Sequence, residues 1–163
     1  MSLEIRPASP RDAEPMATLY LAARRIHLPY APLAHTEAEV RRWVAEVLLP
    51  AGRSWVLSQA PEGAVLGFLS DAPEARDVGD EGGAWIEQLY VHPAHTGQGL
   101  GTRLLCHALA RLPRPLRLYT FEPNAGARRF YERHGFVLQA RGDGSGNEEG
   151  CPDLLMALRD KAL

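Results

Sequence analysis

A short run of alternating glycines carries the clearest chemical signal in the sequence. Gly97, Gly99 and Gly101 are separated by single residues and stand immediately before a stretch whose apolar residues recur at helical spacing. The first N–H groups of a helix have no partner inside it, and glycines let the chain curl so that several of these groups converge on one anion. The run predicts a pyrophosphate site; the alternative is a plain tight connection between a strand and a helix.

Spacing excludes two familiar nucleotide-binding motifs. A nucleoside triphosphate P-loop needs Lys followed by Ser or Thr after its last glycine, whereas Thr102 and Arg103 follow Gly101. A dinucleotide-binding G-x-G-x-x-G turn is also absent, because Leu104 stands where its third glycine would be.

The segments that flank the turn predict how it is held. Residues 85–91, W-I-E-Q-L-Y-V, include five that are β-branched, aromatic or leucine, which favours a buried strand. Pro93 is expected to end the ladder of hydrogen bonds. Residues 100–112 have the periodicity of an amphipathic helix, so the turn should open a helix.

The rest of the chain predicts an α/β protein with a mixed sheet. Capping-box patterns at Ser9–Asp12 and Thr36–Glu39 indicate where the first two helices begin. The expected strands are residues 3–6, 54–59, 64–70, 85–91, 114–121, 136–141 and 154–158, the expected helices are residues 10–26, 36–49, 100–112 and 124–135, and residues 27–35, 71–83 and 142–150 are expected to be loops. Nothing in the composition divides the chain, so residues 1–163 are expected to form one domain.

The composition argues against nucleic acid and membranes as binding partners. The chain is 45% apolar with a formal net charge of −2 and a pI near 6.3, which provides no positive field for nucleic acid or an anionic membrane. The N-terminus lacks the apolar segment of a signal peptide, and no apolar run approaches the ~18 residues of a membrane span. A cytoplasmic protein that binds neither nucleic acid nor membrane is expected.

The cysteines and histidines show no metal-ligand spacing, so no metal is expected. Cys106 and Cys151 are far apart, and Cys106 lies within a periodic helix. Cys106 is therefore interpreted as an inert core thiol.

Two motifs resemble the GNAT superfamily of acyl-CoA-dependent N-acyltransferases. The family's Gln/Arg-x-x-Gly-x-Gly/Ala turn follows a strand that ends in V-x-P, and the matching residues here are Val91, His92, Pro93, Thr96, Gly97, Gln98, Gly99, Leu100 and Gly101. The second motif, N-x-x-A-x-x-x-Y-x-x-x-G-F, matches Asn124, Ala127, Tyr131, Gly135 and Phe136. Thr96 replaces the usual Gln or Arg, so phosphate binding is expected from the backbone. The resemblance implies a GNAT-like mixed, mostly antiparallel central sheet flanked by about four helices.

The resemblance also implies how acetyl-CoA would bind as a co-substrate. The pyrophosphate is expected on the turn, and the pantetheine arm along the preceding strand in the manner of an added strand. The expected contacts are Leu89, Val91, Thr96, Gly97, Gln98, Gly99, Leu100, Gly101, Thr102 and Asn124. Asn124 would hydrogen-bond the arm; its alternative role is a plain helix N-cap.

Tyr131 stands at the family position of the general acid that protonates the departing thiolate, and a phenol with a pKa near 10 keeps its proton at neutral pH. The alternative is a residue at the solvated edge of a core face. An attacking amine must also lose a proton. Glu87 is the candidate base, because strand alternation would place it with Trp85, Leu89 and Val91, where desolvation would raise its pKa. A water relay, His92 and His95 are rivals, and Glu87 could instead pair with an arginine across the sheet.

Family resemblance places the acceptor between the first two helices, their connecting loop and the terminal hairpin. Tyr30, His35 and Trp43 are the expected contacts, with the segment 147–153 as a further wall. Glu148 and Glu149 could attract a cationic amine, or could simply be solvated.

These residues together predict an N-acetyltransferase that moves acetyl from acetyl-CoA directly to a primary amine of a small molecule or polypeptide, through a ternary complex. The alternatives are a non-catalytic acyl-CoA-binding regulatory module, and a scaffold whose glycines only turn the chain. The sequence leaves the acceptor, the acyl chain and the oligomeric state open, a homodimer included.

Overall fold

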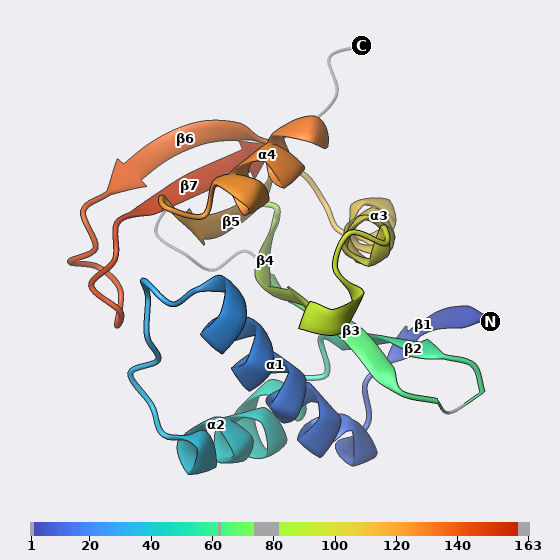
Figure 1. Cartoon of the computed structure of the whole chain (residues 1–163). Coiled ribbons are helices and arrows are strands. Elements are labelled where there is room, and N and C mark those ends of the chain that lie inside the picture. Colours follow the sequence, from blue (N-terminus) through green and yellow to red (C-terminus); the bar gives the residue numbers. More distant parts are fainter. Residues whose placement is uncertain (1, 62, 74–81, 160–163) are drawn as a thin grey trace.

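The structure, a computed structural model of the chain, describes residues 2–61, 63–73 and 82–159. Within these residues, strands form one sheet in the order β1-β2-β3-β4-β5-β7-β6 (Figure 1). The strands are β1 (Leu3–Pro7), β2 (Ser54–Gln59), β3 (Val65–Pro73), β4 (Ala84–Val91), β5 (Leu116–Phe121), β6 (Val137–Gly142) and β7 (Asp153–Leu158). The α-helices are α1 (Ala13–His27), α2 (Glu37–Trp43), α3 (Leu100–Arg111) and α4 (Ala125–Arg133).

The predicted mixed, mostly antiparallel sheet is confirmed. Every neighbouring pair of strands is antiparallel except β4 and β5, which run parallel. Short 3-10 turns at Pro10–Asp12 and Pro93–His95 and a π-helical segment at Val44–Leu48 complete the regular structure of the described residues.

Helices cover both faces of the sheet. On one face, Leu104 and Leu105 of α3 pack with Tyr131 of α4 in a large apolar cluster. On the other face, Met16 of α1 and Val44 of the π-helical segment pack against the sheet in a second cluster. Figure 1 shows α1 and α2 together on one side of β3 and β4, with α3 and α4 on the other.

Local signals in the sequence determine where the helices begin. Asp12 accepts a hydrogen bond from the Ser9 backbone N–H at 2.8 Å, and the Glu39 N–H donates to the Thr36 hydroxyl at 3.1 Å. Both predicted capping boxes are therefore present. Because these caps satisfy N–H groups that the helices cannot, they fix the start of the helical layer that faces β4.

The structure corrects two expectations. Residues 71–73 were expected in a loop, but they extend β3 by pairing with β4, and an ion pair from Arg53 to Asp71 at 2.6 Å neutralises the acid that suggested the loop. In the rest of that expected loop, residues 74–81 lie outside the described residues, and residues 82 and 83 lead into β4. Cys106 is exposed rather than in the core, because Leu104, Leu105 and Ala108 occupy the buried side of α3.

Candidate active site

The parallel strands β4 and β5 separate soon after they begin to pair. Their register contains only Ala84 with Leu116 and Trp85 with Arg117. Beyond these pairs a cavity of about 800 Å³ lies between the strands, lined by Ile86 to Tyr90, except Gln88, on one side and residues 118–121 on the other. We call it the strand-gap cavity. Its volume suits a small ligand.

A β-bulge in β4 lies beside this gap. Ser70 of β3 pairs with Gln88, whereas the next residue, Asp71, pairs with Ile86. β4 therefore has one residue more than β3 at this point, and that residue is Glu87.

The bulge overturns the predicted alternation of side chains. Glu87 was expected on one face with Trp85, Leu89 and Val91, but Ile86 and Leu89 both pack against the apolar cluster under α3. Trp85 instead stacks on Tyr119 of β5, with ring centroids 5.5 Å apart. The two-residue period does not continue through a bulge, so residues before and after it exchange faces.

The glycine turn adopts the backbone conformation that requires glycine. Gly97 and Gly99 have φ values of +77° and +78°, which place both in the left-handed region. A cavity of about 560 Å³, the glycine-turn cavity, lies against this segment. Its lining includes Leu89, Val91, Thr96, Gly97, Gly99, Leu100, Gly101, Thr102, Asn124 and Tyr131. Gln98 is exposed and is not among the lining residues.

The geometry of the turn fits a phosphate group. The Arg103 N–H donates to the Gly99 carbonyl at 3.1 Å, which is the first hydrogen bond of the helix. The N–H groups that precede it, at the start of this 12-residue helix, have no partner within the helix. A Cβ at Gly97 or Gly99 would meet no heavy atom within 4 Å. The backbone is therefore open to a ligand, with the positive end of the helix dipole behind it.

A third cavity of about 720 Å³, the helical cavity, lies on the other face among α1, α2, β4, β5 and the loop between β6 and β7. It is lined by two of the predicted acceptor contacts, His35 and Trp43. The third, Tyr30, is not among its lining residues and lies edge-on to Phe121 at 6.5 Å. Carboxylates outnumber guanidinium groups in the lining, which includes Glu39, Glu46, Glu87, Glu148 and Glu149 against Arg24 and Arg42.

The two predicted catalytic side chains lie between different pairs of cavities. Tyr131 lines the strand-gap and glycine-turn cavities, and Glu87 lines the strand-gap and helical cavities. Burial, and then the neighbouring Tyr90, raise the pKa of Tyr131 above its ordinary value. The phenol is therefore protonated throughout the physiological pH range.

Other predicted residues have more ordinary local roles. The Asn124 side chain accepts a hydrogen bond from the Ala127 N–H at 3.1 Å, so it caps α4, and it also lines the strand-gap and glycine-turn cavities. His92 accepts from the Ala94 N–H at 3.1 Å and lines none of the three cavities. His95 lines the glycine-turn cavity.

Tyr20, Arg24 and Tyr90 line the helical cavity and were not predicted as site residues from the sequence. Tyr90 lines all three cavities, and its ring meets that of Tyr20 edge-on at 5.0 Å. Arg24 is buried, and its guanidinium lies 5.9 Å from the Tyr20 ring centroid. A spacing of four residues within the predicted first helix places Tyr20 and Arg24 on one face, which was the available signal.

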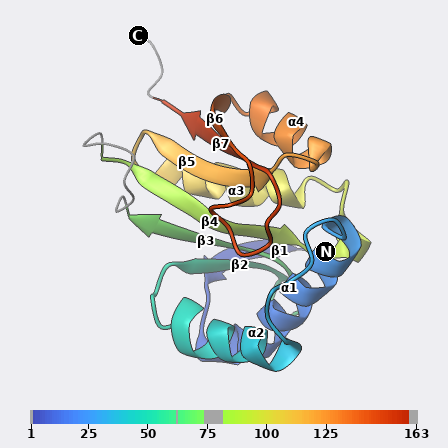
Figure 2. The ribbon, with the colours of Figure 1, turned by 90° about the vertical axis from the view of Figure 1, so that its left-hand side faces the viewer.

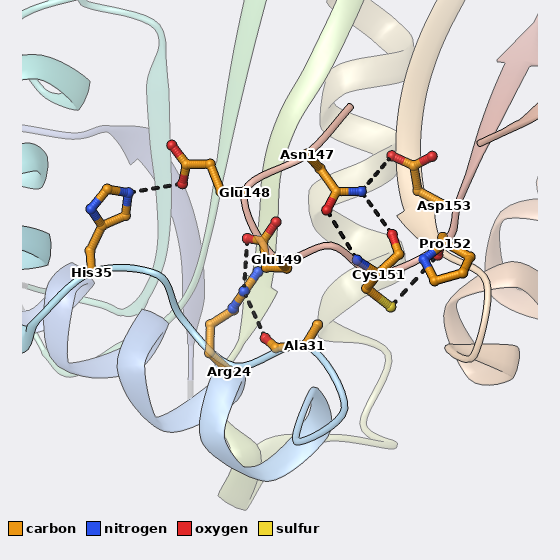
Figure 3. A network of polar contacts seen from close by, with 9 residues as sticks. All are labelled: Arg24, Ala31, His35, Asn147, Glu148, Glu149, Cys151, Pro152 and Asp153. Atoms are coloured by element: carbon orange, nitrogen blue, oxygen red, sulfur yellow. Dashed lines mark hydrogen bonds and ion pairs between the residues drawn. The ribbon is translucent and has the colours of Figure 1, made fainter. Parts of the chain in front are cut away.

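The β6–β7 loop forms one wall of the helical cavity and is attached to the α1 region. Figure 2 shows it passing in front of β4 toward α1. Arg24 donates to Glu149 at 3.1 Å, and His35 contacts Glu148 at 2.8 Å (Figure 3).

Neither a membrane span nor a metal centre was found in the part of the chain that the structure describes. No helix there is long and apolar enough to cross a bilayer. No group of three or more His, Cys, Asp or Glu side chains in that part could hold a metal ion.

Curated relatives match part of the chain. The spermine/spermidine N(1)-acetyltransferase of Bacillus subtilis (strain 168) is 31% identical over 94 residues, which are 53% of this chain. The chain spans only 62% of the length of that relative.

Solved structures resemble the whole fold. A histone acetyltransferase HPA2 and related acetyltransferase from Corynebacterium glutamicum has a TM-score of 0.75 at 20% identity, covering 100% of this chain and 99% of that one. The PaiA N-acetyltransferase of Thermoplasma acidophilum in complex with coenzyme A has a TM-score of 0.70 at 19% identity, covering 98% and 100%. Identities this low support the fold alone.

A family model settles the classification. The model of the acetyltransferase (GNAT) family matches residues 20–136, which are more than half of the chain and include the bulged strand, the glycine turn and α4. The protein belongs to the GNAT family of acetyltransferases.

Proposed function

We propose that this chain transfers an acetyl group from acetyl-CoA directly to a primary amine of a small molecule or peptide. The observation that carries the proposal is that three cavities share Tyr90 of β4 as a lining residue, beside the gap between β4 and β5. The glycine-turn cavity lies on one side of the gap and a carboxylate-rich cavity on the other. Tyr131 and Glu87 would then flank a thioester held in the gap.

Backbone groups would do most of the work of binding acetyl-CoA. Its pyrophosphate would accept hydrogen bonds from the N–H groups of residues 97–102, and its pantetheine arm would lie along Leu89 and Val91. Asn124, at the border of the glycine-turn and strand-gap cavities, would contact the arm through its amide nitrogen while its oxygen caps α4.

Proton transfers at nitrogen and at sulfur complete the reaction. Glu87 would accept one proton from the ammonium form of the acceptor, directly or through a water molecule, from the side of the helical cavity, and pass it to solvent. The neutral amine nitrogen attacks the thioester carbon, and the tetrahedral intermediate expels the sulfur as a thiolate while its nitrogen loses a second proton. Tyr131 would then protonate that thiolate from the side of the glycine-turn cavity, and the second proton from nitrogen would restore the phenol through water. Orientation of the two substrates would supply much of the rate acceleration.

The charge of the helical cavity favours a cationic acceptor. Five carboxylates and two guanidinium groups line it, so a second ammonium group on the acceptor would be attracted there. The 31% identity to a spermine/spermidine N(1)-acetyltransferase agrees with this preference. We therefore propose aliphatic diamines and polyamines as the acceptor class.

A matched pair of amines tests the proposal. The purified chain is incubated with acetyl-CoA and either 1,4-diaminobutane or butylamine, and released thiol is measured. We expect turnover with both and a higher kcat/KM for the diamine, with the difference shrinking as salt screens the cavity. Calorimetric binding of CoA without thiol release for any amine would favour the regulatory module instead.

A further inference from the structure

Arg24 is a buried cation in the wall of the helical cavity. Its side chain is only 6% exposed, and one carboxylate, Glu149, pairs with it at 3.1 Å. Desolvating a guanidinium is costly unless charge and hydrogen bonds compensate. An apolar side chain would fill the same space without this cost, so packing alone does not account for an arginine here.

Arg24 contacts two loops and two strands around the helical cavity. Besides Glu149 on the β6–β7 loop, it donates to the Ala31 carbonyl in the α1–α2 loop at 3.0 Å. Its guanidinium lies 5.6 Å from the Phe121 ring centroid on β5, and it hydrogen-bonds Tyr90 on β4. One side chain on α1 therefore joins two loops and two strands, and Figure 3 shows its contacts with the two loops.

The loop that Arg24 holds is braced from within. Asn147 donates to the Cys151 carbonyl at 2.8 Å and to Asp153 at 3.1 Å, and the Cys151 N–H donates back to Asn147 at 3.2 Å. These bonds make the end of the loop a single unit. Glu149 is its partly buried attachment to the rest of the protein, and Glu148 is an exposed one, through His35.

Arg24 also acts on Tyr90, which lines all three cavities. Burial raises the pKa of Tyr90, whereas the charge and hydrogen bond of Arg24 and a hydrogen bond from Tyr20 lower it. Hydrogen bonds that lower a phenol pKa are those that its oxygen accepts, because they stabilise the phenolate. The Tyr90 hydroxyl is therefore held by two side chains of α1, at a residue that lines all three cavities.

We propose that Arg24 is the positioning residue of the acceptor site. It acts through Glu149, whose attachment places the β6–β7 loop and its carboxylates at the helical cavity, and through Tyr90, whose hydroxyl it orients at the strand gap. The inference rests on the proposed function, since it concerns where the amine binds. It predicts that Arg24 governs amine recognition and leaves acetyl-CoA binding alone.

A double-mutant cycle tests the route through Glu149. In Arg24→Met and in Glu149→Gln we expect the amine KM to rise ~10-fold, and in the double variant to rise no further. The double variant should regain thermal stability relative to Arg24→Met, because no unpaired buried charge remains. If Arg24 only stabilised the fold, the amine KM of the double variant would return towards the wild-type value together with its thermal stability. Effects on KM that multiply would overturn the route through Glu149.

A matched control separates this site from general surface charge. Arg25 is the next residue on α1 and forms an exposed ion pair with Glu37 at 3.4 Å. Arg25→Met should leave the amine KM unchanged. All variants should bind acetyl-CoA within about twofold of wild type by calorimetry. Arg24→Met with a wild-type amine KM overturns the proposal.

A second measurement needs no acetylation. Hydrogen exchange of the Asn147, Gly150 and Cys151 amides, which are hydrogen-bonded within the loop, should quicken in Arg24→Met and not in Arg25→Met. Unchanged exchange overturns the positioning role whatever the activity. Faster exchange in a chain that acetylates no amine would instead show that the proposed function is wrong while Arg24 still positions the loop.

Discussion

Burial determines what Tyr131 can do. Its phenol holds its proton at any physiological pH, yet it borders the two cavities where the thioester sulfur would lie. Tyr131→Phe keeps the ring contacts and removes the proton, so turnover should fall by ~10²–10⁴-fold. Acetyl-CoA affinity, measured by calorimetry, should barely change. Full turnover with chemistry limiting would make Tyr131 a packing residue.

Glu87 is the proposed base for the attacking amine. Glu87→Gln removes the carboxylate beside the helical cavity but keeps the size of the side chain. Since a primary amine has a pKa near 10.4, its free form becomes more abundant as pH rises and needs a base less. The rate should therefore fall most near neutral pH and partly recover in alkali. A pH–rate profile that keeps its wild-type acidic limb would point to a water relay or to a histidine.

His35 makes one loop contact sensitive to pH. Hydrogen bonds from His35 to Glu148 and Glu39 raise the His35 pKa above its ordinary value. The stabilisation is therefore complete below the unfolded pKa of about 6.5 and is lost as pH rises through the raised value. An NMR titration of His35 should give a midpoint above 6.5 that falls in Glu148→Gln. An identical midpoint in the two proteins would mean that the contact does not form in solution.

At the scale of elements, two glycines in the same backbone conformation allow a matched test of phosphate binding by the strand–turn–helix unit. Gly52, in the turn before β2, has φ of +70°, and Gly99 has φ of +78°; a Cβ meets no heavy atom within 4 Å at either. Alanine at each position should cost a similar ~1–2 kcal/mol of stability. Only Gly99→Ala should weaken acetyl-CoA binding. Equal affinities for the two variants would remove the phosphate from this turn.

Most helices and strands could be predicted because their signals are local in the sequence. Features that depend on contacts between distant residues could not. Each of these local signals spans only a few consecutive residues: the capping boxes, the alternating glycines and the apolar strand. The bulge at Glu87 carries no glycine or proline signal and exists only relative to the register of β3. Arg24 and Glu149 are 125 positions apart, so only the folded chain reveals their ion pair.

At the scale of the whole molecule, the sheet consists of two parts joined at a narrow seam. β1 to β4 lie on one side and β5 to β7 on the other, with two paired positions between β4 and β5. Acetyl-CoA bound along β4 and against α4 would bridge them. At 100 times its Kd it should stabilise the fold by about 2.7 kcal/mol and raise Tm by roughly 5–10 °C in a thermal scan. A saturating ligand that leaves Tm unchanged would contradict this placement.

The same seam gives the sheet two inner edges as well as its outer edges at β1 and β6. Outer edges invite other chains to pair and so favour aggregation. The inner edges of β4 and β5 face each other across a bounded gap, so a chain that adds to one must also fit the distance to the other. Recognition in this gap would depend on the width of the ligand and on the spacing of its amide groups. The side chains that surround the gap could then vary widely without loss of binding.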